Sequence, residues 1–254
     1  MAQNISVSTA DHVSIIEITR PPANYFDRQL IGEIVDAAAD VHAHGTRAIV
    51  LCSQGKHFCA GANFAQGEMD EDRARSSELL YREAVRLFDV AVPIIAAVQG
   101  SAVGGGLGLA CAADFRVAAP SSRFHANFSM LGFHHGFGLS VTLPGIVGQQ
   151  KATDLLYTSR RIDGQRAFDI GLVDRLVPDG DVRDEALRWA VEIAAAAPLA
   201  VQSIRQTLRA PLVSQVRAVL DRELAEQRTL WATEDSKIGI AANLAREKAV
   251  FTGQ

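Results

Sequence analysis

Two glycine-rich junctions, each directly after a short apolar run, constrain this chain more than any other feature. One junction spans residues 55–63 and follows the apolar run 48–52. The other spans residues 100–108 and follows the run 93–98. Such short runs are typical of strands covered on both faces. Glycine leaves backbone N–H groups uncovered by side chains, and such donors near a helix N-terminus can stabilise an oxyanion. Close packing of a helix on a strand is an equally good reason for the glycines.

Common glycine motifs do not fit the second junction. A dinucleotide-binding fingerprint would need Gly or Ala at Leu109 or at Cys111, depending on where it starts. A phosphate-binding loop starting at Gly100 would need Lys at Gly106. The chain also lacks a Gly-x-Ser-x-Gly nucleophile elbow and a His-Glu-x-x-His metal motif. An oxyanion-binding turn is the chemical role that this spacing leaves open.

The remaining pattern alternates strand and helix, which predicts an α/β fold with parallel crossovers. Asp27 is placed to cap a helix, and that helix shows apolar residues at 3.6-residue spacing: Leu30, Ile31, Ile34, Val35, Ala38 and Val41. A further helix is predicted over residues 78–90 and a strand over residues 172–177, and from about residue 181 onward the pattern is helical. We therefore predict an α/β core over residues 1–195 and a helical region over 196–254 that packs on the core or on another subunit.

Composition narrows the class of protein further. Of 254 residues, 48% are hydrophobic and the net charge is −4, which does not favour a nucleic-acid or membrane-surface protein. No apolar run approaches the length of a membrane span. Cys52, Cys59 and Cys111 are too scattered for a zinc site or a disulfide framework, so we expect reduced, buried thiols and no bound metal. Without a visible secretory signal at residues 1–4, we expect a cytoplasmic protein.

Several segments together resemble the crotonase (enoyl-CoA hydratase/isomerase) superfamily. They run in family order over residues 3–251, and they are 20–24 (Arg-Pro-Pro-Ala-Asn), 58–62 (Phe-Cys-Ala-Gly-Ala), 98–100, 104–106, 113–114, 131–132, 143–148 and 167–173. The resemblance implies a crotonase-like fold of repeated ββα units with a helical C-terminal region that supports homotrimers or dimers of trimers. It also implies an acyl-CoA thioester as the ligand, with no cofactor beyond the coenzyme A that the substrate carries.

Carried over by position, the resemblance places the thioester oxygen between the backbone N–H groups of Ala62 and Gly105. Those two residues are our predicted oxyanion hole. Substrate contacts are predicted for Ala23 and Ala60 within the matching motifs, for Phe128 and Phe133 as part of an apolar acyl pocket, and for Lys56. Lys56, together with Arg246 or Lys248, could also pair with the nucleotide phosphates of coenzyme A.

The sequence departs from the family pattern where typical hydratases carry two glutamates. By position these read as Gly108 and Phe128, and the aspartate position of some isomerases and dehalogenases reads as Gly136. None of the three can transfer a proton. The nearby pair His134 and His135 is our predicted proton carrier, because imidazole titrates near neutrality.

Weaker candidates surround that pair. His125 and Asn127 could act on substrate or simply end a strand. The acidic run Glu68, Asp70, Glu71 and Asp72 could approach an acyl chain, although a solvated charge run is the simpler interpretation.

We therefore predict an enzyme of the enoyl-CoA hydratase/isomerase type that stabilises a thioester enolate. The two-glutamate hydration mechanism is doubtful for this chain. Double-bond isomerisation, decarboxylation and thioester hydrolysis with a histidine are the open alternatives. A catalytically silent protein that binds CoA esters is the rival from another functional class.

Overall fold

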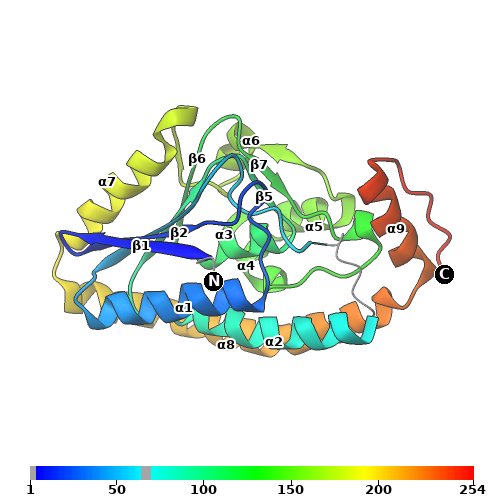
Figure 1. Cartoon of the computed structure of the whole chain (residues 1–254), viewed down its shortest axis with the longest axis horizontal. Coiled ribbons are helices and arrows are strands. Elements are labelled where there is room, and N and C mark those ends of the chain that lie inside the picture. The colour runs from blue at the N-terminus through cyan, green and yellow to red at the C-terminus, as the bar shows by residue number, and fades with distance from the viewer. Residues whose placement is uncertain (1–3, 64–69) are drawn as a thin grey trace.

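The computed structural model describes residues 4–63 and 70–254, whose strands form two sheets (Figure 1). The strands are β1 (Ile5–Ala10), β2 (Val13–Ile18), β3 (Ala48–Ser53), β4 (Ile94–Val98), β5 (Ser101–Val103), β6 (Phe115–Ala118), β7 (Arg123–His125), β8 (Ile162–Asp163) and β9 (Arg175–Leu176). The large sheet has the order β1-β2-β3-β4-β6-β9, and the small sheet has the order β5-β7-β8. In the large sheet only the β1–β2 pair is antiparallel. The predicted parallel crossovers are therefore confirmed.

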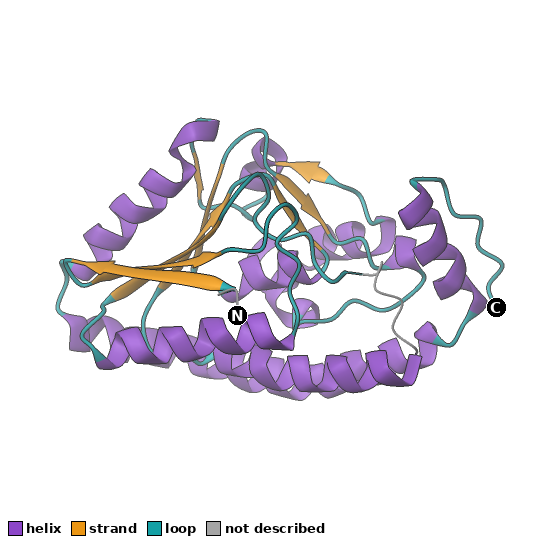
Figure 2. Cartoon of the chain, viewed as in Figure 1, coloured by secondary structure: helices purple, strands orange, loops and turns teal. Residues whose placement is uncertain are grey.

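Helices cover both faces of the large sheet (Figure 2). They are α1 (Arg28–Ala43), α2 (Asp70–Phe88), α3 (Gly105–Ala112), α4 (Leu139–Val147), α5 (Gln149–Thr158), α6 (Gly164–Asp169), α7 (Val182–Ala194), α8 (Pro198–Trp231) and α9 (Glu234–Ala245), with short 3₁₀ turns at Ser129–Leu131 and Asp179–Asp181. Helix α7 lies on one face, whereas α1, α2 and α8 run together on the other side of the molecule (Figure 1). The chain thus forms helix–sheet–helix layers, with the small sheet and α9 beyond one end.

Helix α1 forms where the sequence predicts it. The Asp27 carboxylate caps it by accepting a hydrogen bond from the Leu30 N–H at 2.8 Å. All six residues of the predicted apolar stripe are buried, and the helix ends at the His44 cap before Gly45, whose φ is +91°. A left-handed residue just after a helix is what glycine supplies at least cost.

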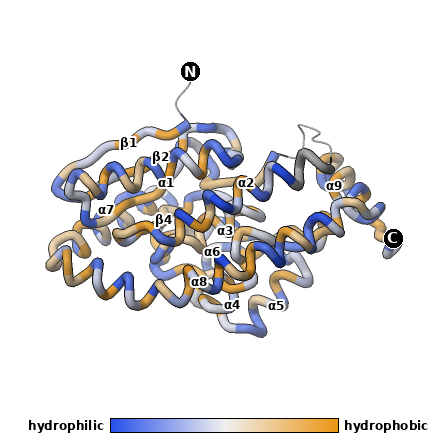
Figure 3. The backbone as a smooth tube through the Cα atoms, turned by 90° about the horizontal axis from the view of Figure 1, so that it is seen from below, coloured by the Kyte–Doolittle hydropathy of each residue, from blue (hydrophilic) through white to orange (hydrophobic). Residues whose placement is uncertain are grey.

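The two faces of the large sheet bury separate apolar clusters. Ala186, Ala190 and Ala194 of α7 pack on one face, where small side chains let the helix approach the strands closely. The other face carries the main core, which α8 completes with Val213, Val216, Leu220, Leu224 and Trp231. Along α8, polar and apolar residues alternate, as expected for a helix with one buried side (Figure 3).

Three elements differ from the predicted pattern. Helix α2 begins at Asp70, eight residues before the predicted start at Glu78. The prediction missed these first turns because their sequence is polar and carries no apolar stripe. Strands β5 and β7 were not predicted, since three residues are too few to show a period. Only Arg175–Leu176 of the predicted strand 172–177 pairs with the sheet, on β6.

Helix α8 is joined to the sheet by charge as well as by apolar contact. Asp114, which precedes β6, accepts hydrogen bonds from Arg205 at 3.1 Å, from Arg209 at 3.0 Å and from the Ile94 N–H at 2.8 Å.

The three cysteines are unbonded and buried, as predicted, and burial raises the pKa of Cys59 to about 12. Within residues 4–63 and 70–254, no helix has the length and apolar character needed to cross a membrane.

Candidate active site

The first glycine junction leaves β3 and runs beside β5. The Cys59 N–H donates to the Ser101 carbonyl at 3.0 Å, and the Val103 N–H donates to the Cys59 carbonyl at 3.0 Å. Gly61 then turns with φ +83°, and a Cβ there would lie 2.7 Å from the Val103 oxygen. Only glycine satisfies both conditions. Ala62 follows in an exposed position, and its N–H makes no hydrogen bond to any described residue.

The second junction contains three glycines that meet three different neighbours. A Cβ on Gly104 would lie 3.0 Å from Asn127 Oδ1, one on Gly105 would lie 2.1 Å from the Phe26 ring, and one on Gly106 would lie 2.1 Å from a carbonyl oxygen. Gly105 is the first residue of α3, so its N–H has no carbonyl partner within the helix. The dipole of α3 adds partial positive charge at this N–H. Close packing and an available donor therefore coexist in this turn.

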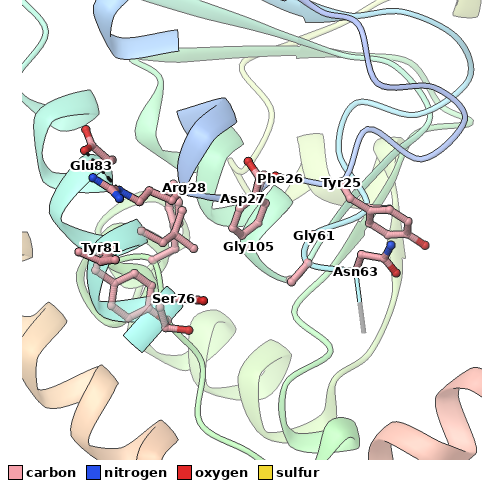
Figure 4. Close-up of a pocket in the computed structure, with 18 of the residues that line it drawn as sticks. Tyr25, Phe26, Asp27, Arg28, Gly61, Asn63, Ser76, Tyr81, Glu83 and Gly105 are labelled. Atoms are coloured by element: carbon pink, nitrogen blue, oxygen red, sulfur yellow. Dashed lines mark ion pairs between the residues drawn. The ribbon is translucent and has the colours of Figure 1, made fainter. Parts of the chain in front are cut away.

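The two junctions meet at one point. The Gly105 nitrogen lies 3.7 Å from the place where a Cβ on Gly61 would be, so the donor of Gly105 and the residue before Ala62 are neighbours. Figure 4 shows Gly61 and Gly105 at the same cavity, with Phe26 beside Gly105. Phe26 is held there because its N–H donates to the Gly61 carbonyl at 3.1 Å.

A cavity of about 960 Å³ opens in front of these turns. Both apolar and polar side chains line it. The apolar lining comes mainly from Phe26, Leu80, Phe128, Leu131, Phe133, Phe137 and Trp231. The polar lining includes Arg20, Asp27, Arg28, Glu33, Asp36, Asn63, Ser76, Ser77, Glu83 and Asn127. Such a cavity suits a long ligand with a polar part and an apolar part.

The predicted oxyanion-hole and substrate residues occupy different places relative to this cavity. Ala62, Gly105, Ala60, Phe128 and Phe133 all line it. The Phe128 and Phe133 rings meet edge to face with centroids 6.1 Å apart. Ala23 and Lys56 lie outside the lining: the Ala23 carbonyl accepts the Ala60 N–H at 3.0 Å, and Lys56 is exposed. The substrate-binding roles of these residues stay predictions.

The predicted histidine pair lies beside the cavity, not in it. Phe133 and Gly136 line the cavity, whereas His134 and His135 between them are not among its described lining residues. The two rings stack with centroids 4.1 Å apart, and His135 Nε2 lies 2.8 Å from Ser140 Oγ. Burial, and secondarily the neighbouring His134, lowers the pKa of His135 to about 4. His135 is therefore uncharged at neutral pH, and a catalytic role for either histidine stays a prediction.

The weaker candidates are also separated from one another. His125 Nε2 lies 2.7 Å from the Ser159 carbonyl, and burial lowers its pKa. Asn127 lines the cavity next to Gly104. Glu68 lies outside the described residues, and Asp70, Glu71 and Asp72 form the start of α2.

Comparisons with known proteins decide the family. Residues 8–254 match the family model described as enoyl-CoA hydratase/isomerase. The chain is 32% identical to the crotonyl-CoA hydratase of Syntrophomonas wolfei over 254 residues, covering 98% of each chain. It is also 28% identical to the crystal structure of an enoyl-CoA hydratase/isomerase from Pseudoalteromonas atlantica T6c, with a TM-score of 0.87 over 98% of this chain and 100% of that one.

The chain belongs to the enoyl-CoA hydratase/isomerase family. A longer relative, the peroxisomal fatty acid beta-oxidation multifunctional protein AIM1 of Arabidopsis thaliana, is 34% identical over 237 residues, and this chain matches 33% of its length. The crotonase resemblance and the α/β fold class predicted from the sequence are thus confirmed.

Of the three positions where the resemblance would place acids, Gly108 and Gly136 are closed by packing and the third is occupied by Phe128. A Cβ on Gly108 would lie 2.7 Å from Phe137 Cβ, and a Cβ on Gly136 would lie 1.8 Å from the Tyr81 hydroxyl. Phe128 directs an aromatic ring to the cavity, where its ring meets that of Phe133. A carboxylate could not replace either glycine unless Phe137 or Tyr81 moved.

Two side chains that the sequence analysis did not single out approach the cavity at Gly136. Tyr81 of α2 and Gln227 of α8 both line it, and the Tyr81 hydroxyl donates to Gln227 Oε1 at 2.7 Å. Gln227 Nε2 in turn donates to the His134 carbonyl at 3.0 Å. Burial, and secondarily the charge of Glu223, raises the pKa of Tyr81 far above its usual range.

Glu223 of α8 binds the backbone of residues 138–140, which follow Gly136 in the chain. Its carboxylate is fully buried and accepts the N–H groups of Gly138 at 2.8 Å and Ser140 at 2.9 Å. Burial raises the pKa of Glu223, and these hydrogen bonds oppose that rise. No local motif marks Tyr81, Glu223 or Gln227; a polar group at a buried position of an amphipathic helix is the only signal that each carries.

Proposed function

We propose that the protein binds an acyl-CoA thioester and stabilises its enolate between the N–H groups of Ala62 and Gly105. The observation that carries this proposal is the meeting of the two glycine turns at one cavity, with the N-terminus of α3 supplying one donor. Forming the enolate places negative charge on the thioester oxygen. Backbone donors fixed before reaction need no reorganisation to meet that charge. Membership of the family supports the same ligand class.

Within the described residues, the two-glutamate hydration mechanism finds no acid at Gly108 or Phe128. The alternatives are isomerisation and decarboxylation, which pass through an enolate, and thioester hydrolysis, which passes through a tetrahedral oxyanion at the same carbonyl carbon. The sequence favours His134 and His135 as proton carriers, and motion of residues 134–136 would be needed to bring either ring into the cavity. A silent binder of CoA esters is the second candidate, because the packing at Gly108 and Gly136 excludes the usual acids.

We place the protein in the cytoplasm as a homotrimer or a dimer of trimers. Leu199, Ile204 and Leu208 of α8 are 79%, 59% and 73% exposed, which is the apolar surface that a neighbouring subunit would cover. Sedimentation equilibrium tests this part, and a monomer at micromolar concentration would refute it.

Two optical measurements test the proposed function. Acetoacetyl-CoA, whose acyl group forms an enolate readily, should gain the near-ultraviolet band of its enolate when the protein is added. Crotonyl-CoA should keep its enone absorbance, because no glutamate pair hydrates it. Absence of the enolate band at saturating protein would refute the oxyanion hole, and rapid loss of the enone would show that another base performs hydration.

A further inference from the structure

The wall of the cavity formed by α2 presents an acid that the sequence analysis did not identify. Tyr81 lines the same cavity as Gly61, Ala62 and Gly105, and its side chain is almost fully buried. In Figure 4 the Tyr81 ring lies across the cavity from Gly61 and Asn63, with Gly105 between the two sides. The Tyr81 oxygen occupies the space over Gly136, 1.8 Å from where a Cβ would be.

Two hydrogen bonds fix the position of the Tyr81 oxygen beside Gly136. The hydroxyl donates to Gln227 Oε1 at 2.7 Å, and it forms a further hydrogen bond with the Phe137 backbone. Transfer of the phenolic proton to a ligand would break the hydrogen bond to Gln227, and the Phe137 contact, which favours the ionised form, would stabilise the oxygen that remains. Because burial and the Glu223 charge raise the pKa of Tyr81, the phenol stays neutral and acts as a donor, not as a base.

The described carboxylates of the cavity are already engaged. Asp27 pairs with Arg20 at 2.7 Å, and both Asp36 and Glu83 pair with Arg86 at 2.6 Å. Glu33 accepts hydrogen bonds from side-chain amides at 2.8 Å. Among the described lining residues, the site therefore offers a neutral acid and no unengaged carboxylate base.

This combination separates the candidate reactions. Hydration and thioester hydrolysis need a base that takes a proton from water, and isomerisation needs one that takes a proton from carbon. Decarboxylation needs neither, because the breaking C–C bond itself supplies the electron pair of the enolate. It then needs one proton, delivered to carbon.

We propose, building on the proposed function above, that Tyr81 protonates the α-carbon of an enolate formed by decarboxylation of a malonyl-type (2-carboxyacyl) CoA thioester. The bond between the α-carbon and the carboxylate breaks, and CO₂ leaves. The electron pair forms the enolate, whose oxygen lies between the N–H groups of Ala62 and Gly105. The phenolic proton of Tyr81 then passes to the α-carbon, and water restores it. The net reaction consumes one proton and yields CO₂ and the shortened acyl thioester.

The apolar side chains of the cavity lining suit this chemistry. Phe26, Phe128 and Phe133 would surround the reacting carbon with hydrocarbon. A carboxylate loses hydration in such surroundings, whereas CO₂ is neutral, so the environment disfavours the starting charge more than the product.

The test uses malonyl-CoA and methylmalonyl-CoA in deuterated water with the full-length protein. Mass spectrometry should detect acetyl-CoA and propionyl-CoA, and the propionyl-CoA should carry deuterium at C2 in one configuration only. Tyr81→Phe, which keeps the ring, should lower the rate about 10²–10⁴-fold. The residual product should be deuterated without stereochemical preference, which loss of mere structural support would not cause. Tyr157→Phe, at a phenol that is 79% exposed, is the matched control and should keep the wild-type rate.

The acetoacetyl-CoA enolate band distinguishes a failure of the proposed function from a failure of the inference about Tyr81. If the wild-type protein lacks the band, the proposed function fails. If it shows the band but decarboxylates neither thioester, this inference alone is overturned. Wild-type rate and stereochemistry in Tyr81→Phe, or racemic deuteration by the wild-type protein, would also overturn it. Because the last result needs no variant, the inference stays testable even if Tyr81→Phe folds poorly.

Discussion

The two walls of the cavity are built from different parts of the chain. One wall consists of backbone: Gly61, Ala62 and Gly105, joined through short strands and held by hydrogen bonds between main-chain atoms. The opposite wall consists of side chains, where Tyr81 of α2 and Gln227 of α8 meet the loop at Gly136. Donors supplied by the backbone depend on chain conformation. Donors supplied by side chains depend on which residues three distant segments bring together.

This difference teaches why a family can keep one wall and change the other. Replacing a side chain leaves the N–H of Ala62 or Gly105 in place, so the oxyanion site tolerates variation around it. On the opposite wall a single residue decides whether a proton donor, a base or neither is present. Breaking each wall separately should therefore give different losses.

Apart from the loss already expected for Tyr81→Phe, the largest effect should come from the backbone wall. Ala62→Pro removes one N–H donor, and the loss of one oxyanion-hole donor typically costs about 10²–10³ in rate. We expect a loss of that size in kcat/KM for the thioester that is turned over, with a weaker acetoacetyl-CoA enolate band. Ala62→Gly keeps the donor and should stay within about tenfold of the wild type, as a control for backbone freedom. A Pro variant as active as the Gly variant would show that Ala62 is not a donor.

The next effect concerns stability on the side-chain wall. Gly136→Ala places a Cβ 1.8 Å from the Tyr81 oxygen and 2.8 Å from Gln227 Nε2, so it should cost about 1–3 kcal/mol of unfolding free energy. Urea denaturation measures this cost. In a Tyr81→Phe background the cost should shrink, because the hydroxyl is gone, and the two changes should be coupled by at least about 0.5 kcal/mol.

Gly145→Ala in α4 is the matched control for that substitution, since nothing lies within 4 Å of its would-be Cβ. It should change stability by no more than about 0.5 kcal/mol. Equal losses at Gly136 and Gly145 would show that the contact with Tyr81 does not constrain the wall.

The sequence predicted most of the fold because its signals are local and periodic. The α1 stripe and its Asp27 cap, the buried strands β3 and β4, and the glycine junctions each lie within one short segment. The miss at the start of α2 has the opposite cause, since polar turns without a stripe resemble a solvated loop. The three-residue strands β5 and β7 carry too little pattern to be recognised.

The residues of the candidate site also differ in how far the sequence could predict them. Gly105 is marked by a glycine on either side and Gly61 by the family motif at 58–62, so their meeting could be expected from the family resemblance. The contact of Tyr81 with Gly136 and Gln227 joins positions 55 or more residues apart, and no spacing rule brings them together. His134 and His135 lie between two lining residues in the sequence, yet neither is among the described lining residues of the cavity. Position along the chain therefore does not determine whether a side chain enters the site.

Acid pH should test how the side-chain wall is buried. The folded pKa of His135 is about 4, below its ordinary value of 6.5, so the unfolded chain binds more protons between those values. Stability from this residue is complete above pH 6.5 and is lost as the pH falls toward 4. Because the ring is only partly buried, we expect a loss of about 1–2 kcal/mol relative to His135→Asn.

Urea denaturation of both proteins from pH 7.5 to 4.5 would measure this difference. Parallel curves for the wild type and His135→Asn would mean that His135 is solvated in the native state.

The smallest effect should come from the cap beside the backbone wall. Asp27 Oδ1 accepts the Leu30 N–H at 2.8 Å, so Asp27→Ala should cost about 1 kcal/mol of stability. Asp27→Asn keeps a cap and removes the ion pair with Arg20, which at a surface site is worth less than about 1 kcal/mol. Neither variant should weaken the acetoacetyl-CoA enolate band, because Phe26 keeps its hydrogen bond to Gly61. If Asp27→Ala did weaken that band, the start of α1 would position the oxyanion donors, and the backbone wall would depend on a side chain after all.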